Sequence, residues 1–348
     1  MRPTGREGPT MWQVAITGSE QVELMVRDVP VLRPGWALVK ILAAPLCAEY
    51  KLYRSGRRLT DIGHEAAGEV VEVAPGSMVA VGDRVVVMPQ YSCGVCALCR
   101  AGDYIYCQQP LDYEAGALSQ YIAKPSWLLP RLPDTVSMDA GSLACCGLGP
   151  SFGALERLGV DRFSTVLVTG LGPVGLGAVI NAAFRGARVI GVEANPYRAR
   201  LAKDLGADLV LDPHDPDIAA QIMAATEGRG IATGVECAGV IAAHRLQIEV
   251  AAPRAHIVFV GECPDPTPIR VSPDLIRHGL VLEGSWHYNL NLVPRVLRVA
   301  QEAAGIRRFV THTFGRAAIQ AAFEVSSGQR CGKVIWHPWQ EDTDEGLT

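Results

Sequence analysis

The sequence lacks a strong excess of either charge and is poor in aromatic residues. Its 348 residues hold 32 Lys and Arg against 36 Asp and Glu, a formal net charge of −4, and only 6% are aromatic. A nucleic-acid-binding protein usually shows a basic face or stripe, so no nucleic-acid partner is expected. Internal repeats and low-complexity blocks are also missing. With 49% apolar residues, the chain is long enough for two globular domains, each with its own core.

A long apolar leader is absent as well. The first residues, MRPTGREGPTMWQVAI, are basic and contain no apolar run that would form the core of a signal peptide, so the protein is expected in the cytoplasm. Residues 165–184 (TVLVTGLGPVGLGAVINAAF) carry no charge, but Gly and Pro crowd their middle and the first part is β-branched. This pattern indicates a strand, a turn and a helix rather than a membrane span, and no membrane partner is expected.

Cysteine, in contrast, is abundant, with ten residues. The cytosol keeps thiols reduced, so metal binding is the first alternative to a disulfide framework. The stretch SCGVCALCRAGDYIYC has the spacing C-x2-C-x2-C-x7-C, formed by Cys93, Cys96, Cys99 and Cys107. Four thiolates in one loop close a tetrahedral shell around Zn²⁺ and leave no open position, so the spacing predicts a structural zinc site. An iron–sulfur cluster uses similar ligands and is the competing interpretation.

The rhythm of the chain changes near residue 158. Before it, short β-type stretches such as WALVKILAA, GEVVEVAPG and DRVVVMPQ are separated by closely spaced Gly and Pro, which predicts a β-rich, barrel-like domain. After it, strand-like and helix-like segments alternate, which is typical of a doubly wound parallel sheet. The sequence therefore predicts an α/β protein in which about residues 147–285 form a nucleotide-binding domain.

A glycine-rich turn, GLGPVG, follows the first strand of that second part. The first glycine permits the tight turn, the second lets the backbone approach a pyrophosphate, and the third lets helix pack on strand. The helix N-terminus then supplies amide donors to the phosphates. An acidic residue ends the next strand, VIGVE, 23 positions after the first glycine. The predicted cofactor-binding residues are Gly170, Gly172, Pro173, Val174, Gly175, Glu193 and Arg198.

Two of these residues bear on the choice of dinucleotide. The Glu193 carboxylate would hydrogen-bond the adenosine ribose hydroxyls and repel a 2′-phosphate, which favours NAD(H) over NADP(H). Arg198 acts against this choice, since a nearby arginine accommodates a phosphate. The alternative for the whole motif is a glycine-rich packing turn with an incidental carboxylate.

A third set of residues is scattered along the chain: Cys47 in APLCAEYK, His64 and Glu65 in IGHEAAGEVV, and the pair Cys145 and Cys146. Each residue alone is better explained as a packed histidine or a small buried hydrophobe. Together they offer a three-ligand zinc site with an open fourth position. Adjacent side chains project differently, so only one cysteine of the pair is expected to ligate. Glu65 either orients the site or binds zinc itself.

These motifs, in this order, resemble the zinc-containing medium-chain alcohol dehydrogenases. The resemblance covers nearly all of residues 11–338, including GHEAAGEVV, VGDRVVV, the four-cysteine loop, ALSQYIAKP, GLGPVG and EGS after the last strand. It implies a GroES-like β-rich catalytic domain over residues 1–146 and 286–348, and a Rossmann NAD-binding domain over residues 147–285. By position, Cys47, His64 and Cys146 correspond to the catalytic zinc ligands of the family. Its members are commonly dimers or tetramers, which implies a homo-oligomer.

The chain departs from this resemblance two residues after Cys47. Glu49 stands where the family usually has Ser or Thr, which passes a proton outward, and Leu52 stands where many members have His. Our hypothesis is that Glu49 handles the proton as a base. The alternatives are that Glu49 reaches the metal, hydrogen-bonds a polyhydroxylated substrate, or turns to solvent and pairs with Lys51 or a nearby arginine.

The resemblance implies an NAD-dependent enzyme with two zinc ions per chain that interconverts a secondary alcohol and a ketone. A carboxylate near the cleft and the few aromatic residues favour a small polar substrate such as a polyol, sugar or cyclitol. One alternative is an aldehyde or ketone reductase of a biosynthetic pathway, and another is a non-catalytic NAD-sensing or scaffold protein that retains only the structural zinc. Residues 285–289 (SWHYN) indicate either a pocket wall or an interface. The predicted catalytic residues are Cys47, Glu49, His64, Glu65 and Cys146.

Overall fold

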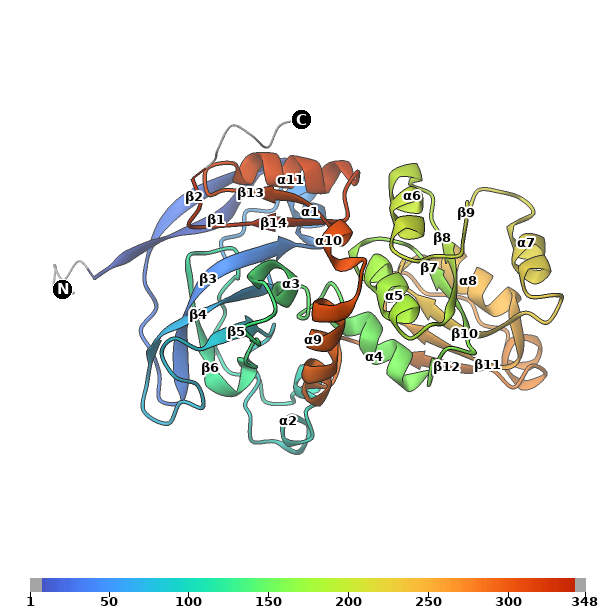
Figure 1. Cartoon of the computed structure of the whole chain (residues 1–348), viewed down its shortest axis with the longest axis horizontal. Helices are drawn as coiled ribbons and strands as arrows, with labels where there is room; N and C mark the ends of the chain where they lie inside the picture. Colours follow the sequence, from blue (N-terminus) through green and yellow to red (C-terminus); the bar gives the residue numbers. More distant parts are fainter. Residues whose placement is uncertain (1–7, 342–348) are drawn as a thin grey trace.

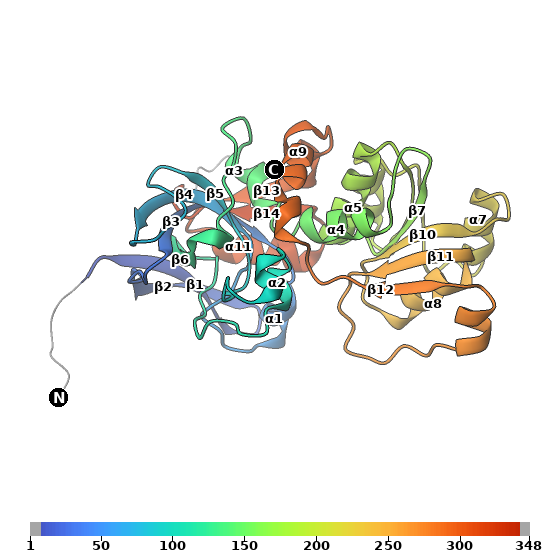
Figure 2. The ribbon, with the colours of Figure 1, turned by 90° about the horizontal axis from the view of Figure 1, so that it is seen from below.

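Strands from both ends of the chain meet in one sheet. The computed structural model describes residues 8–341 and is shown in Figures 1 and 2. Residues 1–7 and 342–348, which include part of the N-terminal stretch used to predict localisation, lie outside the described residues. The sheet has the order β13-β14-β3-β4-β5, with β6 also pairing with β3, while β1 and β2 form a separate hairpin. The N-terminal strands are β1 Thr10–Gly18, β2 Gln21–Asp28, β3 Trp36–Leu46, β4 Ala66–Val73, β5 Arg84–Val87 and β6 Tyr121–Pro125.

Strand β3 is the centre of this sheet. Nine of its 11 residues are buried, because it pairs antiparallel with β4, β6 and β14 and is covered on both faces. Strand β1 is one that the sequence analysis did not predict. Short helices fill the connections of this lobe: α1 Glu49–Ser55, α2 Ala97–Arg100, η1 Tyr104–Tyr106, η2 Ser126–Leu128 and α3 Met138–Ser142.

The C-terminal segment returns to the first lobe. Strand β14 pairs antiparallel with β3, with Val334 opposite Leu46 and Trp336 opposite Ala44. In Figure 1 this red segment lies against the blue strands of the N-terminal part. The pairing brings Lys333 close to the end of β3, next to Cys47. The elements of the return are η4 Leu290–Leu292, α9 Val293–Glu302, α10 Ile306–Phe309, β13 Val310–Phe314, α11 Ile319–Gly328 and β14 Lys333–Trp336.

The second lobe is built on a parallel sheet of order β12-β11-β10-β7-β8-β9. After β7 the chain builds β8 and β9 on one side and β10 to β12 on the other, so a crevice opens at the carboxyl ends of β7 and β10. Its elements are α4 Gly149–Arg157, β7 Thr165–Thr169, α5 Pro173–Phe184, β8 Arg188–Val192, α6 Pro196–Asp204, β9 Leu209–Leu211, α7 Ile218–Ala225, β10 Ile231–Glu236, α8 Ile241–Glu249, β11 Ala251–Phe259, the π-helix η3 Val271–Ile276 and β12 Val281–Gly284.

The two architectures confirm the predicted α/β fold, a β-rich part together with a doubly wound parallel sheet. The uncharged stretch 165–184 forms β7, the glycine turn and α5. Within residues 8–341, no helix is long and apolar enough to cross a membrane. The predicted domain boundaries at residues 146 and 285 stay a prediction.

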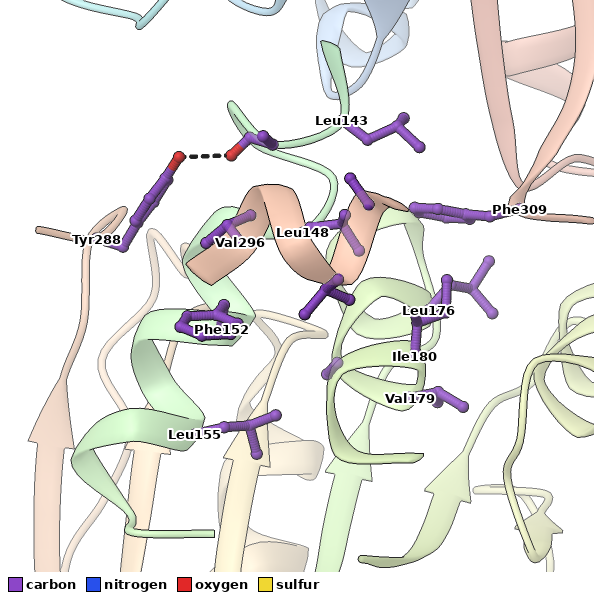
Figure 3. Packing of buried hydrophobic residues seen from close by; sticks show 14 of the residues in the cluster. Leu143, Leu148, Phe152, Leu155, Leu176, Val179, Ile180, Tyr288, Val296 and Phe309 are labelled. Carbon is purple, nitrogen blue, oxygen red and sulfur yellow. Dashed lines mark hydrogen bonds between the residues drawn. The ribbon is translucent and has the colours of Figure 1, made fainter. Parts of the chain in front are cut away.

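One hydrophobic cluster continues from one lobe into the other. It joins residues of the first sheet, such as Ala67 and Val86, to helices α4, α5 and α9 and to strands of the parallel sheet. Figure 3 shows Phe152 of α4, Leu176 of α5 and Val296 of α9 gathered in this core. Helix α9 turns one apolar face inward, whereas α4 and α5 are buried on all sides over most of their length. The shared core therefore joins the lobes on either side of the site described next.

Candidate active site

Four side chains from three distant parts of the chain bring their ligand atoms together. Cys47 follows β3, His64 and Glu65 precede β4, and Cys146 follows α3. Their ligand atoms all lie within 4.8 Å of one another. The Sγ atoms of Cys47 and Cys146 are 3.9 Å apart. Thiolate sulfur and imidazole nitrogen are preferred ligands of Zn²⁺, so this donor set fits a zinc ion.

Cys145, the neighbour of Cys146, is not part of this group. Its thiol donates to the carbonyl oxygen of His64, with 3.1 Å between Sγ and O. The structure therefore brings Cys146, and not Cys145, to Cys47. The hydrogen bond with Cys146 lowers the pKa of the Cys47 thiol well below its usual value, and the Lys333 ammonium acts in the same direction. A lowered pKa favours the thiolate, which is the metal-binding form.

Glu49 lies behind His64, away from the cavity wall. Its carboxylate accepts a hydrogen bond from the backbone N–H of Cys47 at 2.6 Å and lies 2.7 Å from Nδ1 of His64. Glu49 is 4% exposed, so it does not turn to solvent to meet Lys51. Burial alone would lower the pKa of His64, but the Glu49 carboxylate and Cys47 together outweigh it and raise the pKa well above its ordinary value. With Nδ1 held by Glu49, the other ring nitrogen is left for a metal.

Glu65 is held by a buried lysine that the sequence analysis missed. Its Oε1 forms an ion pair with Nζ of Lys333, and both side chains are fully buried. Its Oε2 accepts a hydrogen bond from the backbone N–H of Gly147 at 3.1 Å. The ammonium of Lys333 also lies 3.4 Å from the carbonyl oxygen of Leu46. The available signal was a lysine inside the apolar strand GKVIW, where a charge needs a partner.

The four cysteines of the second motif also meet. The Sγ atoms of Cys93, Cys96, Cys99 and Cys107 lie within 4.8 Å of one another, in a lobe formed by α2 and η1. Backbone N–H groups of Val95 and Cys96 lower the pKa of Cys93 to about 6, whereas burial raises that of Cys99 to about 12. A divalent cation would allow all four thiols to ionise together, and the donor set fits a closed zinc site.

The glycine-rich turn connects β7 to α5. Gly170 has φ of +79°, a left-handed conformation that favours glycine. A Cβ added to Gly175 would lie 1.9 Å from the carbonyl oxygen of Gly170, so only glycine fits there. Pro173 begins α5, and Gly172, Pro173 and Val174 line the cavity in front of the helix. The turn thus offers open backbone at a helix N-terminus, as phosphate binding requires.

Glu193 and Arg198 lie beside this turn. The Glu193 carboxylate accepts hydrogen bonds from the backbone N–H of Leu171 at 2.7 Å and of Asn195 at 2.8 Å. The buried Arg198 places Nη1 3.9 Å from the position that a Cβ of Gly172 would occupy. Arg198 therefore lies against the glycine turn, while Glu193 lies at the end of β8.

A single cavity of about 1060 Å³ joins these features. Its lining includes Cys47, His64 and Cys146 as well as Gly172 and Glu193. Trp286 and His287 of the SWHYN stretch also line it. Metal ligands and a dinucleotide turn therefore face one continuous space.

Comparisons with known proteins extend over almost the whole chain. Residues 33–134 match the family described as alcohol dehydrogenase GroES-like domain, and residues 173–302 match the family described as zinc-binding dehydrogenase. L-threonine 3-dehydrogenase of Pyrococcus furiosus is 30% identical, covering 92% of this chain and 95% of that protein. L-idonate 5-dehydrogenase of Vitis vinifera is 28% identical, covering 96% of this chain and 95% of that protein.

A solved structure has the same fold. The alcohol dehydrogenase TADH from Thermus sp. ATN1 superposes with a TM-score of 0.87, covering 94% of this chain and 100% of that chain, at 24% identity.

Proposed function

The chain belongs to the zinc-binding alcohol dehydrogenases of the medium-chain dehydrogenase family, and from this membership we propose that it oxidises a small polar secondary alcohol to a ketone with NAD. The family resemblance predicted from the sequence is thereby confirmed. Polyols, sugars and cyclitols are the proposed substrates. The reverse reaction, reduction of a ketone, uses the same groups. Which direction predominates depends on the substrate and coenzyme concentrations in the cell.

The observation that carries this proposal is the single cavity shared by two kinds of site. The ligand atoms of Cys47, His64 and Cys146 and the glycine turn line the same space. Hydride transfer needs the alcohol carbon and the nicotinamide in contact, and one cavity allows this. A protein that retained only the structural zinc would have no need of the second ligand set. This supports an enzyme over a scaffold.

Each residue has a proposed role. Zinc held by Cys47, His64 and Cys146 would supply a Lewis acid for the alcohol oxygen, and NAD would accept the hydride. Glu49 holds Nδ1 of His64 and the N–H of Cys47, so we propose that it positions these two ligands. Glu65, paired with Lys333, supports the site from behind. Proton handling by Glu49 remains a second proposal for the same side chain.

The proposed coenzyme is NAD rather than NADP. The Glu193 carboxylate keeps lone pairs free for ribose hydroxyls while it accepts two backbone hydrogen bonds, and its charge would repel a 2′-phosphate. Arg198 lies against Gly172, which places its charge beside the pyrophosphate turn. This position supports a role of Arg198 with the pyrophosphate rather than with a 2′-phosphate.

Polar groups near the metal ligands support a polar substrate. Tyr50, Lys51 and Gln90 line the cavity together with His287. They are hydrogen-bonding groups that a hydroxylated substrate would use. We further propose that the protein is a homodimer or homotetramer and that it acts in the cytoplasm, as expected from the sequence.

The test is a metal analysis combined with a screen for coenzyme reduction. The proposal expects two zinc ions per chain and NADH formation with at least one polyol, sugar alcohol or cyclitol, with slower reduction of NADP. Carefully prepared protein that holds a single zinc ion, or that reduces neither coenzyme with any alcohol, would contradict the proposal.

A further inference from the structure

The residues that follow β12 are tied to the four-cysteine lobe, residues 92–107. The backbone N–H of Trp286 donates to the hydroxyl of Tyr106 at 3.0 Å. The amide of Asn289 donates to the carbonyl oxygen of Ala101 at 2.9 Å and to a carboxylate oxygen of Asp103 at 2.8 Å. The four-cysteine lobe thus anchors Trp286 and Asn289, which flank two further residues of the segment.

Those two residues are His287 and Tyr288. Tyr288 is buried beneath the start of α4, and its hydroxyl donates to the carbonyl oxygen of Ala144 at 2.6 Å, as Figure 3 shows. His287 has φ of +57°. This left-handed conformation is unfavourable for a residue with a Cβ. It persists because the residues on both sides are anchored.

His287 lines the cavity together with the ligands Cys47 and His64. Its Nδ1 lies 3.4 Å from the hydroxyl of Tyr104, which also belongs to the lobe. Its Nε2 has no hydrogen-bond partner in the described part of the chain. Burial lowers the pKa of His287 to about 3. The ring is therefore neutral near pH 7 and can donate or accept one hydrogen bond through Nε2.

We infer that His287 hydrogen-bonds a second polar group of the substrate, next to the reacting carbon, and that the four-cysteine lobe holds it in place for this task. The inference rests on the proposed function and narrows its substrate class to alcohols with a neighbouring hydroxyl or carbonyl, such as vicinal diols. His287 is then a specificity-determining residue. The lobe, with its own metal ligands, acts as the support of one cleft wall.

The experiment compares two substrates that differ by one hydroxyl, butane-2,3-diol and butan-2-ol, in zinc-loaded protein with saturating NAD. His287→Asn keeps a polar atom near the position of Nδ1 and a residue that tolerates positive φ, but it removes Nε2. The KM for the diol should rise about tenfold, the loss of one hydrogen bond, with kcat within about twofold. The KM for butan-2-ol should change by less than about threefold. His287→Gln, which reaches the position of Nε2, should recover part of the diol affinity.

Two further variants test the lobe. Tyr104→Phe and Asn289→Ala leave the His287 side chain intact and should raise the diol KM in the same direction by a smaller factor. Binding can also be measured without turnover, as the increase in Tm that the diol causes in the NADH-loaded protein. This increase should be smaller than in the wild type in His287→Asn, Tyr104→Phe and Asn289→Ala. His256→Asn, a histidine of β11 paired with Glu283, serves as control and should behave as the wild type.

The outcomes separate the two proposals. Wild-type protein that turns over neither alcohol, nor any other alcohol of the screen, overturns the proposed function. Wild-type turnover together with equal KM changes for both alcohols in His287→Asn overturns the inference alone. If Tyr104→Phe and Asn289→Ala leave the KM for the diol and its effect on Tm unchanged, the claim that the four-cysteine lobe positions His287 is overturned.

Discussion

Glu236 and His244 form a buried pair beside the coenzyme cleft. One carboxylate oxygen of Glu236 accepts hydrogen bonds from the backbone N–H of Ala238 at 2.7 Å and Gly239 at 3.0 Å. The other lies 3.4 Å from Nε2 of His244, and both of these atoms are buried without a hydrogen bond in the described residues. Burial raises the pKa of Glu236 to about 7. Burial also lowers the pKa of His244, so the pair favours neutral groups.

The free energy of unfolding should therefore decrease as the pH rises, because ionised Glu236 is disfavoured in the folded protein. A carboxyl that is harder to ionise in the folded chain contributes stability below about pH 4.5, and this contribution is lost as the pH rises through about 7. Glu236→Gln keeps the acceptor for both N–H groups and removes the charge. We expect the variant to be more stable than the wild type at pH 8, by up to about 3 kcal/mol, and similar to it at pH 4.5. Thermal melts at both pH values measure this, and a pH-independent difference would contradict it.

Glu49 offers a second prediction at the residue scale, because its two proposed roles respond differently to substitution. Glu49→Ala removes the partner of His64 Nδ1 and should weaken zinc binding at the open site about 10- to 100-fold, leaving the four-cysteine site filled. Glu49→Gln keeps one acceptor oxygen, enough for Nδ1–H of His64, while its amide nitrogen would face the N–H of Cys47, so it should weaken zinc binding less than Glu49→Ala does. Metal analysis after mild chelation separates the variants. If Glu49→Gln then shows wild-type turnover and pH profile, the proton-handling role is wrong.

The sequence predicted well which residues come together at the candidate zinc site. It predicted poorly which neighbouring side chains hold these residues in place. Residue type suggested Cys47, His64 and one of Cys145 and Cys146 as zinc ligands, and the family resemblance pointed to Cys146. The partner of His64 could not be read from spacing, since it depends on how α1 turns after β3. Lys333 was missed for a similar reason. Its pairing with Glu65 needs β14 beside β3, a contact between residues 268 positions apart.

At the scale of elements, the glycine turn allows two substitutions with opposite expectations. A Cβ at Gly175 would collide with the carbonyl oxygen of Gly170, whereas a Cβ at Gly172 has no atom closer than Arg198 Nη1 at 3.9 Å. Gly175→Ala should lower the Tm of the coenzyme-free protein by several degrees, since the backbone must shift. Gly172→Ala should leave that Tm nearly unchanged but weaken NADH binding at least about tenfold, because a methyl group keeps a pyrophosphate from the backbone.

Melting curves without coenzyme and fluorescence titration with NADH measure the two effects. Equal losses in both variants would mean that the turn serves packing alone, which was the alternative open at the sequence level. Periodicity predicted the alternating elements of the parallel sheet well, because strands such as β7 and β8 are apolar runs and helices such as α5 and α6 begin at Pro. It missed β1, whose nine residues mix exposed and buried positions irregularly.

At the scale of the whole molecule, the two lobes share one core, so the cleft has walls from both. The SWHYN segment illustrates why the sequence left its role open. Tyr288 packs into the shared core, while Trp286 and His287 face the cavity. In a short stretch that crosses between the lobes, some residues pack in the core and others line the cavity. Only the tertiary structure shows which residue does which.

The edge of the parallel sheet carries the last prediction, which concerns assembly. Strand β12 is the outer strand of that sheet, and Val281 on it is 49% exposed. The segment leading into it exposes Ile269, Val271 and Ile276 at 42%, 60% and 70%. Unpaired strand edges with exposed apolar residues favour pairing with another chain. A second copy of this chain is the proposed partner, in line with the expected homo-oligomer.

Val281→Lys should therefore shift the protein towards the monomer, because a charge on the outer strand opposes close pairing. Light scattering coupled to size-exclusion chromatography measures the mass at several concentrations. Met78→Lys is the matched control, since Met78 is an exposed apolar residue of the other lobe, at 71%, and should leave the mass unchanged. A Val281→Lys protein with wild-type mass, or a wild type that is monomeric at all concentrations, would show that this edge stays unpaired and that exposed apolar residues here serve no assembly.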